Sequence, residues 1–411
     1  MNRSKRTLPL LIVCTVSLLA IAAASWWFRP WSPYSPNVMT KLLHPEYRLQ
    51  NFRQMEKVFP FRVIPASAEP FVFPHGTAAS LPESFSYDGR IIDTQEFIQR
   101  SETTGLMVLQ QGNNLFEQYF LDAQASDRFT SWSVAKTVVG TLAAIAQAEG
   151  HIESFDDPVK RYVSELEGKA WGEVPIRELL RMSSGIQFDE TYDDKFSDIN
   201  VLFYRTFLLG QGVRDIIADL PAARPAGETF AYLSPNTQIL AWVVEQAVGE
   251  PLSEYTSSAL WQPLGMQDDA LWSVDQSGVE MSFCCLNMTL RDYAKLGQLY
   301  LQQGVWRDQP LLPQGWVKQS HQLQPLEPQK PAEKSERDYG YHLWMPKNAQ
   351  QEYFFNGVWG QSVWVDEQHD VVIVKTSVDP LFRQHMGEMI AFMRAISSHI
   401  GNQSSAAAAS H

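Results

Sequence analysis

The stretch RFTSWSVAKTVVGTLAAIAQAEG, residues 128–150, reads as the entry and body of one apolar helix. Ser133 and Lys136 stand three residues apart in its first turn, so the two side chains share one face of that helix. A lysine that faces an apolar interior is costly unless it has a partner or a chemical task. Two interpretations follow: an N-cap serine beside a surface lysine, or a nucleophile beside the base that activates it.

The segments around this helix alternate between strand-like and helix-like patterns. A hairpin pattern at 104–122 precedes it, a mainly helical region follows from about 155 to 300, and a polar loop is expected at 325–338. The expected helices cover residues 175–182, 234–249, 289–304 and 380–398, and the expected strands cover 339–345, 352–358 and 361–377. We therefore predict an α+β fold, in which the N- and C-terminal parts form one antiparallel sheet flanked by helices, with a mainly helical insertion.

The composition narrows the possible partners. The 411 residues are 45% hydrophobic, which is enough to bury the core of one large domain or two smaller ones. A net charge of −13 without a basic patch argues against nucleic acid. The three cysteines and nine histidines show no spacing typical of metal ligands. We expect a small-molecule substrate, with no nucleic acid, no metal and no cofactor.

The N-terminus predicts export. Residues 7–28 carry no charge, follow the basic stretch MNRSKR and are long enough to cross a bilayer as a helix. A cleaved signal peptide with small residues at 22–24 is the alternative, and either form carries the rest of the chain across the membrane. We favour an inner-membrane anchor and a periplasmic domain. The expected organisation is an anchor or signal peptide at 1–28, a linker and wrapping segment at 29–84, the main domain at 85–398 and a flexible tail at 399–411.

Two further segments supply groups that a serine nucleophile would need. Tyr232 lies in a predicted loop before a helix and can relay a proton if its surroundings lower its pKa. A strand that ends at Gly357 would turn the Val358 N–H toward the nucleophile, where it can stabilise an oxyanion. The simpler alternatives are a tyrosine that packs on the helical region and a glycine that makes a turn. The stretch VKTS at 374–377 ends the following strand and is not assigned to the site.

Cys284 and Cys285 are adjacent in the sequence. We interpret them as two small buried residues, because free cysteine behaves as a small apolar side chain. A disulfide between the two neighbours is the less favoured alternative, since it would require strained geometry.

Three segments together, SWSVAK, FAYLSPNTQILAWVVE and NGVWGQSVWVDEQHDVVIV, resemble the motifs of the serine β-lactamase and penicillin-binding-protein superfamily. Over about residues 85–395 the chain is similar to its class C β-lactamase-like hydrolases. The stretches LLRMSSGIQFDE, LNMTLRDYAKLGQLYLQQGVW and DYGYHLW strengthen the match. Within that group, Tyr-x-Ser at Tyr232–Ser234 and Gly-x-x-Gly-Gln at Gly357–Gln361 point to the 6-aminohexanoate-dimer hydrolase type and related esterases.

The resemblance implies a role for each matching residue. Ser133 would be the acylated nucleophile, Lys136 its general base, and Tyr232 the proton relay to the leaving group. The N–H groups of Ser133 and Val358 would form the oxyanion hole. The implied substrate-binding residues are Ser234, Gly357 and Tyr192, the last of which is equally open to a structural role.

The sequence departs from true class C β-lactamases in two motifs. It has Tyr232-Leu233-Ser234 where they have Tyr-x-Asn, and Phe355-Asn356-Gly357 where they have Lys-Thr-Gly. Phe355 cannot pair with the carboxylate of a β-lactam, so we expect weak β-lactam hydrolysis. Cys284 and Cys285 stand where relatives commonly have small glycines, which would reshape one wall of the pocket.

The predicted function is an extracytoplasmic serine hydrolase that cleaves an amide or ester bond through an acyl-enzyme on Ser133. The alternative is a membrane-tethered protein that binds cell-wall peptide or penicillin with little turnover, an interpretation favoured by the anchor and by Phe355. An α/β-hydrolase is disfavoured, because the chain contains no Gly-x-Ser-x-Gly elbow.

Overall fold

The structure, a computed structural model, describes residues 4–321, 326 and 336–409. Within these residues, the largest sheet has seven antiparallel strands in the order β11-β12-β13-β14-β15-β4-β5. Strand β4 of the N-terminal hairpin pairs with β15 near the C-terminus, so the predicted α+β fold with one sheet from both parts of the chain is confirmed. The strands are β4 (Thr103–Gln110), β5 (Asn113–Tyr119), β11 (Arg337–Tyr339), β12 (Trp344–Pro346), β13 (Glu352–Gly357), β14 (Gln361–Asp366) and β15 (Val371–Ser377).

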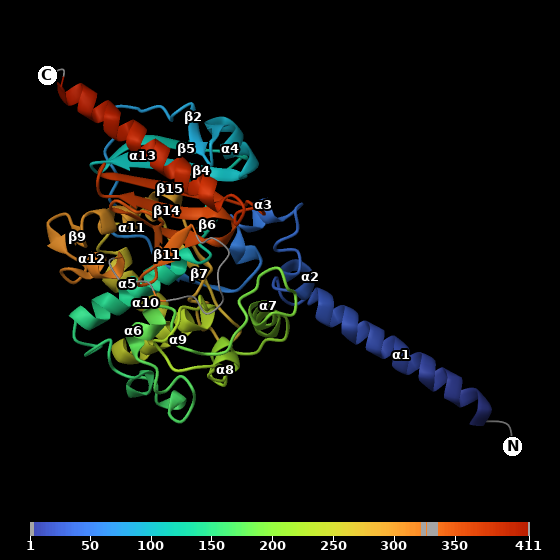
Figure 1. Ribbon diagram of the computed structural model, residues 1–411. Coiled ribbons are helices and arrows are strands. Elements are labelled where there is room, and N and C mark those ends of the chain that lie inside the picture. Colours follow the sequence, from blue (N-terminus) through green and yellow to red (C-terminus); the bar gives the residue numbers. More distant parts are fainter. Residues whose placement is uncertain (1–3, 322–325, 327–335, 410–411) are drawn as a thin grey trace.

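The sequence VVIVKTS of β15 explains why helices cover both faces of this sheet. Val371 and Ile373 pack on one side with Met393 of helix α13, whereas Val372 and Val374 belong to the core on the other side. Alternate side chains of a strand point to opposite faces, and here both sets are apolar. Figure 1 shows α13 along one face of the sheet and most of the other helices on the opposite side. The covering helices are α5 (Val134–Ala148), α11 (Leu290–Leu301) and α13 (Met386–Ala409).

Helix α11 approaches the sheet closely at Gly297. A Cβ at this position would lie 2.6 Å from Val372 Cγ1 and 2.7 Å from Val363 Cγ1, which is closer than packed carbon atoms tolerate. Glycine therefore allows α11 to lie directly on β14 and β15, although it is a poor helix former.

The region between the two parts of the sheet is mainly helical, as predicted. Helix α9 (Ser234–Val248) starts directly after the Tyr232 loop and packs against α5. It ends at Gly249, whose left-handed φ of 79° is typical of a helix-terminating glycine. The other elements of this region are η2 (Val159–Arg161), η3 (Ser164–Leu166), α6 (Ile176–Leu180), α7 (Asp198–Phe203), η4 (Tyr204–Leu208), α8 (Val213–Ile217), α10 (Leu252–Thr256) and η5 (Ser257–Trp261).

A second sheet, with the order β1-β7-β8-β6, ties the N-terminal segment to the main domain. Strand β1 (Phe61–Ile64) pairs with β7 (Ala270–Ser273), and β6 (Phe129–Thr130) pairs with β8 (Leu286–Met288) just before Ser133. Residues 29–84 therefore contribute a strand to the folded body, which the sequence analysis did not predict. The remaining elements are α2 (Pro36–Met39), α3 (Arg48–Asn51), η1 (Met55–Lys57), β2 (Ser84–Tyr87), β3 (Arg90–Asp93), α4 (Thr94–Arg100), β9 (Val305–Trp306), β10 (Gln309–Pro310), α12 (Trp316–His321) and η6 (Val358–Gly360).

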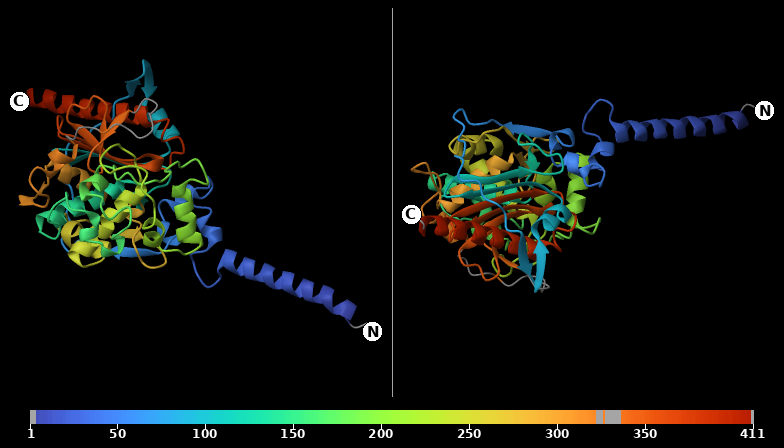
Figure 2. Two further views of the ribbon diagram at one scale, coloured as in Figure 1. Left: turned by 60° about the horizontal axis from the view of Figure 1, so that its bottom comes forward. Right: turned by 90° about the horizontal axis from the view of Figure 1, so that it is seen from above.

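Both ends of the described chain are helical. Helix α1 (Ser4–Phe28) extends away from the folded body in Figures 1 and 2, and its stretch Leu11–Phe28 is long and apolar enough to cross a membrane. Helix α13 starts at Met386 and runs to Ala409, so the helix predicted at 380–398 begins and ends later than expected. The expected tail at 399–411 is thus helical as far as Ala409, because its alanines favour helix. The loop predicted at 325–338 lies largely outside the described residues.

Candidate active site

Ser133 lies at a tight turn between strand β6 and helix α5. It is the N-cap residue of α5, and Trp132 before it has a left-handed φ of 44°. The Ser133 hydroxyl makes no capping hydrogen bond; instead, Lys136 Nζ donates to Ser133 Oγ over 3.0 Å. The predicted pair is therefore in direct contact, at a helix start where backbone N–H groups are not used within the helix.

Lys136 is buried, with only 1% of its surface exposed. Its Nζ also donates to Ser234 Oγ over 3.2 Å and to the Phe283 carbonyl over 2.9 Å, so these three hydrogen-bond acceptors are neutral oxygens. Burial lowers the pKa of Lys136 to about 8, although the negative charge of Glu190 opposes the shift. A lysine in this state can lose its proton near neutral pH and accept the proton of Ser133.

Tyr232 reaches the same serine from the loop before α9. Its hydroxyl is hydrogen-bonded to Ser133, and its ring centroid lies 5.0 Å from Lys136 Nζ. Burial raises the pKa of Tyr232, which packs against the rings of Tyr339 and Trp344. The condition that its surroundings lower this pKa is therefore not met, because removal from water disfavours the phenolate. A neutral phenol can still pass a proton on, and Lys136 is the better base.

Glu190 is a site residue that the sequence analysis did not single out. Its Oε2 accepts a hydrogen bond from Ser234 N over 2.9 Å and its Oε1 accepts one from Ser234 Oγ over 2.5 Å. Burial raises the pKa of Glu190, and the charge of Lys136 opposes that shift. A continuous network thus runs from Ser133 through Lys136 and Ser234 to Glu190. The SGIQFDE stretch was its only sequence signal, and one loop carboxylate has no periodicity that points to a serine 44 residues away.

Strand β13 ends beside the segment that carries the nucleophile. A Cβ on Gly357, its last residue, would lie 2.4 Å from the Ser131 carbonyl oxygen, so only glycine fits this close approach. Val358 follows at the start of η6, where Trp359 turns the chain with a left-handed φ of 63°. The predicted strand end at Gly357 is confirmed, and Val358 is the next residue along the turn.

Tyr192 is tied to the same network. Its hydroxyl donates to Glu190 Oε1 over 2.8 Å, and the Arg383 guanidinium lies 5.2 Å from the centroid of its ring. Burial raises the pKa of Tyr192, so the phenol stays protonated. These contacts give Tyr192 a role in holding Glu190, while contact with substrate stays a prediction.

Phe355 and Lys375 lie in different strands of the large sheet. Phe355 is buried in β13, with its ring centroid 4.8 Å from that of Tyr300. Lys375 is buried in β15, where it pairs with Ser362 of the intervening strand β14. Its pKa is lowered to about 8 by burial. Lys375 therefore does not occupy the position of the motif lysine, in agreement with leaving VKTS out of the site.

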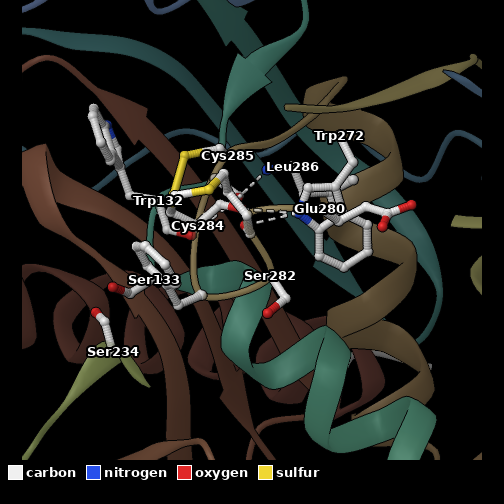
Figure 3. Close-up of a disulfide and its surroundings, with 12 residues drawn as sticks. Trp132, Ser133, Ser234, Trp272, Glu280, Ser282, Cys284, Cys285 and Leu286 are labelled. Carbon is white, nitrogen blue, oxygen red and sulfur yellow. Dashed lines mark hydrogen bonds between the residues drawn. A yellow bond between two sulfur atoms is a disulfide. The ribbon is translucent and has the colours of Figure 1, made fainter. Parts of the chain in front are cut away.

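Cys284 and Cys285 form a disulfide with each other, which corrects their interpretation as two unlinked residues. Both are buried, as predicted, and Cys285 has a left-handed φ of 66°. Figure 3 shows the disulfide near the turn that carries Trp132 and Ser133. The sequence could not decide this bond, because a bond between neighbouring cysteines depends on the turn conformation that the surrounding structure imposes.

The site is suited to proton transfer. Among the described residues, no cluster of three or more histidine, cysteine, aspartate or glutamate side chains is placed to hold a metal ion. The groups gathered around Ser133 are hydroxyls, one amine and one carboxylate, which are the groups of general acid–base catalysis.

Comparison with known proteins identifies the family. The family model described as "Beta-lactamase" matches residues 90–381, so the chain belongs to this family. The chain is 31% identical over 302 residues to the 6-aminohexanoate-dimer hydrolase of Paenarthrobacter ureafaciens, an alignment that covers 71% of this chain and 76% of the relative. A β-lactamase of Providencia stuartii is 25% identical over 135 residues, or 33% of this chain and 32% of that protein. The protein is thus a hydrolase of the β-lactamase family, and the resemblance found in the sequence is confirmed.

Solved structures share the fold. A Bacillus anthracis protein assigned as a 6-aminohexanoate-dimer hydrolase superposes with a TM-score of 0.80 at 21% identity, over 90% of this chain and 99% of that chain. EstCE1, a hydrolase with promiscuous acyltransferase activity, superposes with a TM-score of 0.57 at 16% identity, over 75% of this chain and 96% of that chain. The architecture is therefore that of the β-lactamase and DD-peptidase fold.

Proposed function

We propose that this protein is an extracytoplasmic serine hydrolase that cleaves an amide or ester bond of a small molecule through an acyl-enzyme on Ser133. The observation that carries the proposal is the 3.0 Å contact between Ser133 Oγ and Nζ of the buried Lys136. A lysine whose hydrogen-bond acceptors are neutral oxygens is expensive to bury, and activation of Ser133 gives it a task. Membership of a hydrolase family supports the same reaction class.

In the acylation step, neutral Lys136 accepts the Ser133 proton while Oγ attacks the carbonyl carbon of the substrate. The N–H groups of Ser133 and Val358 hold the oxyanion that forms. Tyr232 gives its proton to the leaving nitrogen or oxygen and is reprotonated from Lys136, so the amine or alcohol departs neutral. The raised pKa of Tyr232 suits this step, because the phenol keeps its proton until the leaving group takes it.

In the deacylation step, water replaces the leaving group. Lys136 and Tyr232 remove one proton from water as its oxygen attacks the acyl carbonyl, and that proton returns to Ser133 Oγ when the acid leaves. Ser234 and Glu190 support both steps, because their hydrogen bonds keep Lys136 Nζ within reach of Ser133.

The substrate class follows from the relative and from the third motif. The Paenarthrobacter relative is named for hydrolysis of a 6-aminohexanoate dimer, which makes a linear amide the first candidate substrate. Phe355, buried against Tyr300, offers no positive charge to the carboxylate of a β-lactam. We therefore propose linear amides or esters in preference to β-lactams.

Helix α1 supports a location outside the cytoplasm. Basic residues precede its apolar stretch Leu11–Phe28, which favours a cytoplasmic N-terminus and a periplasmic domain. We expect intact protein in the inner-membrane fraction after cell fractionation. A soluble periplasmic product whose mass corresponds to a chain that starts after residue 24 would contradict the anchor and favour the signal peptide.

Labelling with a fluorophosphonate probe tests the nucleophile. We expect wild-type protein to be labelled and Ser133→Ala to be unlabelled. Ser258→Ala is the matched control, because Ser258 in η5 hydrogen-bonds to its neighbour Tyr255 outside the network around Ser133. Equal labelling of wild type and Ser133→Ala, or none in either, would refute the serine-hydrolase proposal.

A comparison of substrates tests the proposed class. We expect steady turnover of p-nitrophenyl esters or linear amide dimers and little turnover of a chromogenic cephalosporin. The reverse ranking would refute the interpretation of Phe355. Release of one p-nitrophenol per enzyme without further turnover would favour the second candidate, a membrane-tethered binding protein with little turnover, which helix α1 supports.

A further inference from the structure

The turn at residues 281–285 connects the two catalytic segments. On one side, Leu286 N donates to Ser131 Oγ over 3.1 Å, and Ser131 N donates to the Leu286 carbonyl over 2.8 Å. On the other side, Ser282 N donates to Gln238 Oε1 over 3.0 Å, in the helix that follows Tyr232. The turn therefore contacts the segment that carries the nucleophile and the segment that carries the proton relay.

Phe283, within this turn, presents two groups to Lys136. Its carbonyl accepts a hydrogen bond from Nζ over 2.9 Å, and its ring centroid lies 5.5 Å from the same nitrogen. Nζ is therefore held between the Phe283 carbonyl on one side and Ser133 Oγ on another. Movement of the carbonyl would change where Nζ lies relative to the nucleophile.

The disulfide begins directly after Phe283. It joins Cys284 to Cys285 and thereby closes a small ring that contains the peptide bond between them. Cys285 holds a left-handed φ of 66°, a conformation that costs free energy for a residue with a side chain. Trp272 Nε1 donates to the Cys284 carbonyl over 3.0 Å. Figure 3 shows Trp132 and Ser133 on one side of the disulfide turn and Trp272 on the other.

We propose that the Cys284–Cys285 disulfide is a positioning element of the catalytic site, which holds the Phe283 carbonyl where it fixes Nζ of Lys136 beside Ser133 Oγ. The inference rests on the proposed function, because it requires Lys136 to act as the base. The disulfide itself touches no reacting atom. It acts by securing the left-handed backbone conformation at residue 285, in a turn that contains no glycine.

The Phe283 carbonyl also influences the charge on Lys136. An acceptor stabilises the ammonium form, so its loss lowers the pKa of Lys136 further. The other titratable groups that act on Nζ are the Glu190 carboxylate, Tyr232 and His342. Burial raises the pKa of Tyr232 and lowers that of His342 to about 3, so both are neutral at neutral pH. A displaced turn therefore lowers kcat and moves the acid limb of kcat/KM to lower pH.

Three full-length proteins in detergent test the proposal. Each carries Cys14→Ser, so that a cysteine can remain only at positions 284 and 285. The first keeps the disulfide, and its presence is checked by intact mass after alkylation with and without reduction. The second is C284S/C285S. The third is C284A/C285G, in which glycine adopts a left-handed φ without help from a disulfide. For each, kcat and KM for a p-nitrophenyl ester are measured at pH values on both sides of the Lys136 pKa.

We expect C284S/C285S to lose about tenfold in kcat, the effect of roughly one hydrogen bond to a charged group, with KM changed by less than about twofold. Its acid limb should move to lower pH. C284A/C285G should keep wild-type kcat within about twofold and keep the wild-type pH profile, because glycine restores the backbone conformation. If C284S/C285S does not fold, C284A/C285A replaces it, since it differs from C284A/C285G only in the tolerance of residue 285 for positive φ.

Three results would overturn the proposal. They are a wild-type kcat and pH profile in the variant with serine or alanine at residue 285, equal losses in that variant and C284A/C285G, or two free thiols in Cys14→Ser protein extracted from the inner membrane. Failure of the proposed function looks different. In that case the Cys14→Ser protein with its disulfide intact would itself neither turn over an ester nor be labelled at Ser133.

Discussion

Two buried lysines, Lys136 near the start of helix α5 and Lys295 near the start of helix α11, differ in the groups that they contact. Lys136 in α5 and Lys295 in α11 are 1% and 0% exposed, and each contacts a polar residue three positions earlier. For Lys295 that residue is Asp292, which forms an ion pair with it at 2.9 Å. For Lys136 it is Ser133, and its other hydrogen-bond acceptors are also neutral oxygens.

The N-terminal caps of the two helices also differ. In α11 the Thr289 hydroxyl caps the helix, because it accepts a hydrogen bond from Asp292 N. In α5 the Ser133 hydroxyl caps nothing and faces Lys136 instead. Burial lowers the pKa of both lysines, but a carboxylate in direct contact opposes the shift only at Lys295. We infer that a buried lysine without a direct counter-ion is suited to act as a base, whereas one that is paired with a carboxylate has a structural role.

Replacement of each lysine by methionine should give the largest difference in activity between the two positions. We expect Lys136→Met to lose about 10³-fold or more in kcat/KM, because proton removal from Ser133 no longer has a base. Labelling by the fluorophosphonate probe and ester hydrolysis measure this effect. Lys295→Met is the matched control, and its kcat per folded molecule should equal that of the wild type. Comparable activity losses in both variants would show that burial, and not the partner, decides the role.

The two variants should also differ in stability, and here the larger loss is expected for Lys295→Met. Lys295→Met leaves the Asp292 carboxylate buried without its counter-ion, so the free energy of unfolding should fall by about 3 kcal/mol. Three further hydrogen bonds to Asp292, from Gln267 N, Asp268 N and the Thr289 hydroxyl, keep the loss from being larger. Urea unfolding followed by fluorescence measures it. An unchanged unfolding midpoint for Lys295→Met would contradict a structural role for this ion pair.

The pH dependence of activity tests whether Lys136 is the titrating base. Lys136 must be neutral to act as a base, and burial holds its pKa at about 8. We therefore expect kcat/KM to rise with pH, about tenfold per unit below that value, and to level off above it. Initial rates with a p-nitrophenyl ester at low substrate concentration give the profile. A profile that is flat between about pH 6 and pH 8 would mean that Lys136 is not the titrating base.

Glu190→Gln should produce the smallest change. Its negative charge raises the pKa of Lys136, so its removal should shift the acid limb to lower pH, with a severalfold change in rate at the plateau. Glutamine keeps an acceptor for Ser234, which limits disturbance of the hydrogen bonds. The pH profile of this variant, compared with that of wild type, is the measurement. A shift to higher pH would contradict the electrostatic role assigned to Glu190.

Local patterns in the sequence were enough to predict much of the fold. The hairpin of β4 and β5, helix α9 and the strand end at Gly357 all follow from periodicity, caps and turn residues that lie within a few positions of one another. Strand β1 was missed, because residues 61–64 take their conformation from a distant partner strand. The start of α13 was placed too early, because Leu381 and His385 instead form a turn that hydrogen-bonds to Asp379.

The proximity of Ser133 and Lys136 could be predicted from the sequence alone, since one helical turn places residues three apart on one face. Only the tertiary structure decided what surrounds that pair: Glu190 behind Ser234, the Phe283 carbonyl at Nζ, the neutral state of Tyr232 and the bond between Cys284 and Cys285. Each of these depends on burial or on contacts between segments far apart in the chain. Burial and long-range contact arise only when the helices and the sheet pack together, so no local pattern could have carried them.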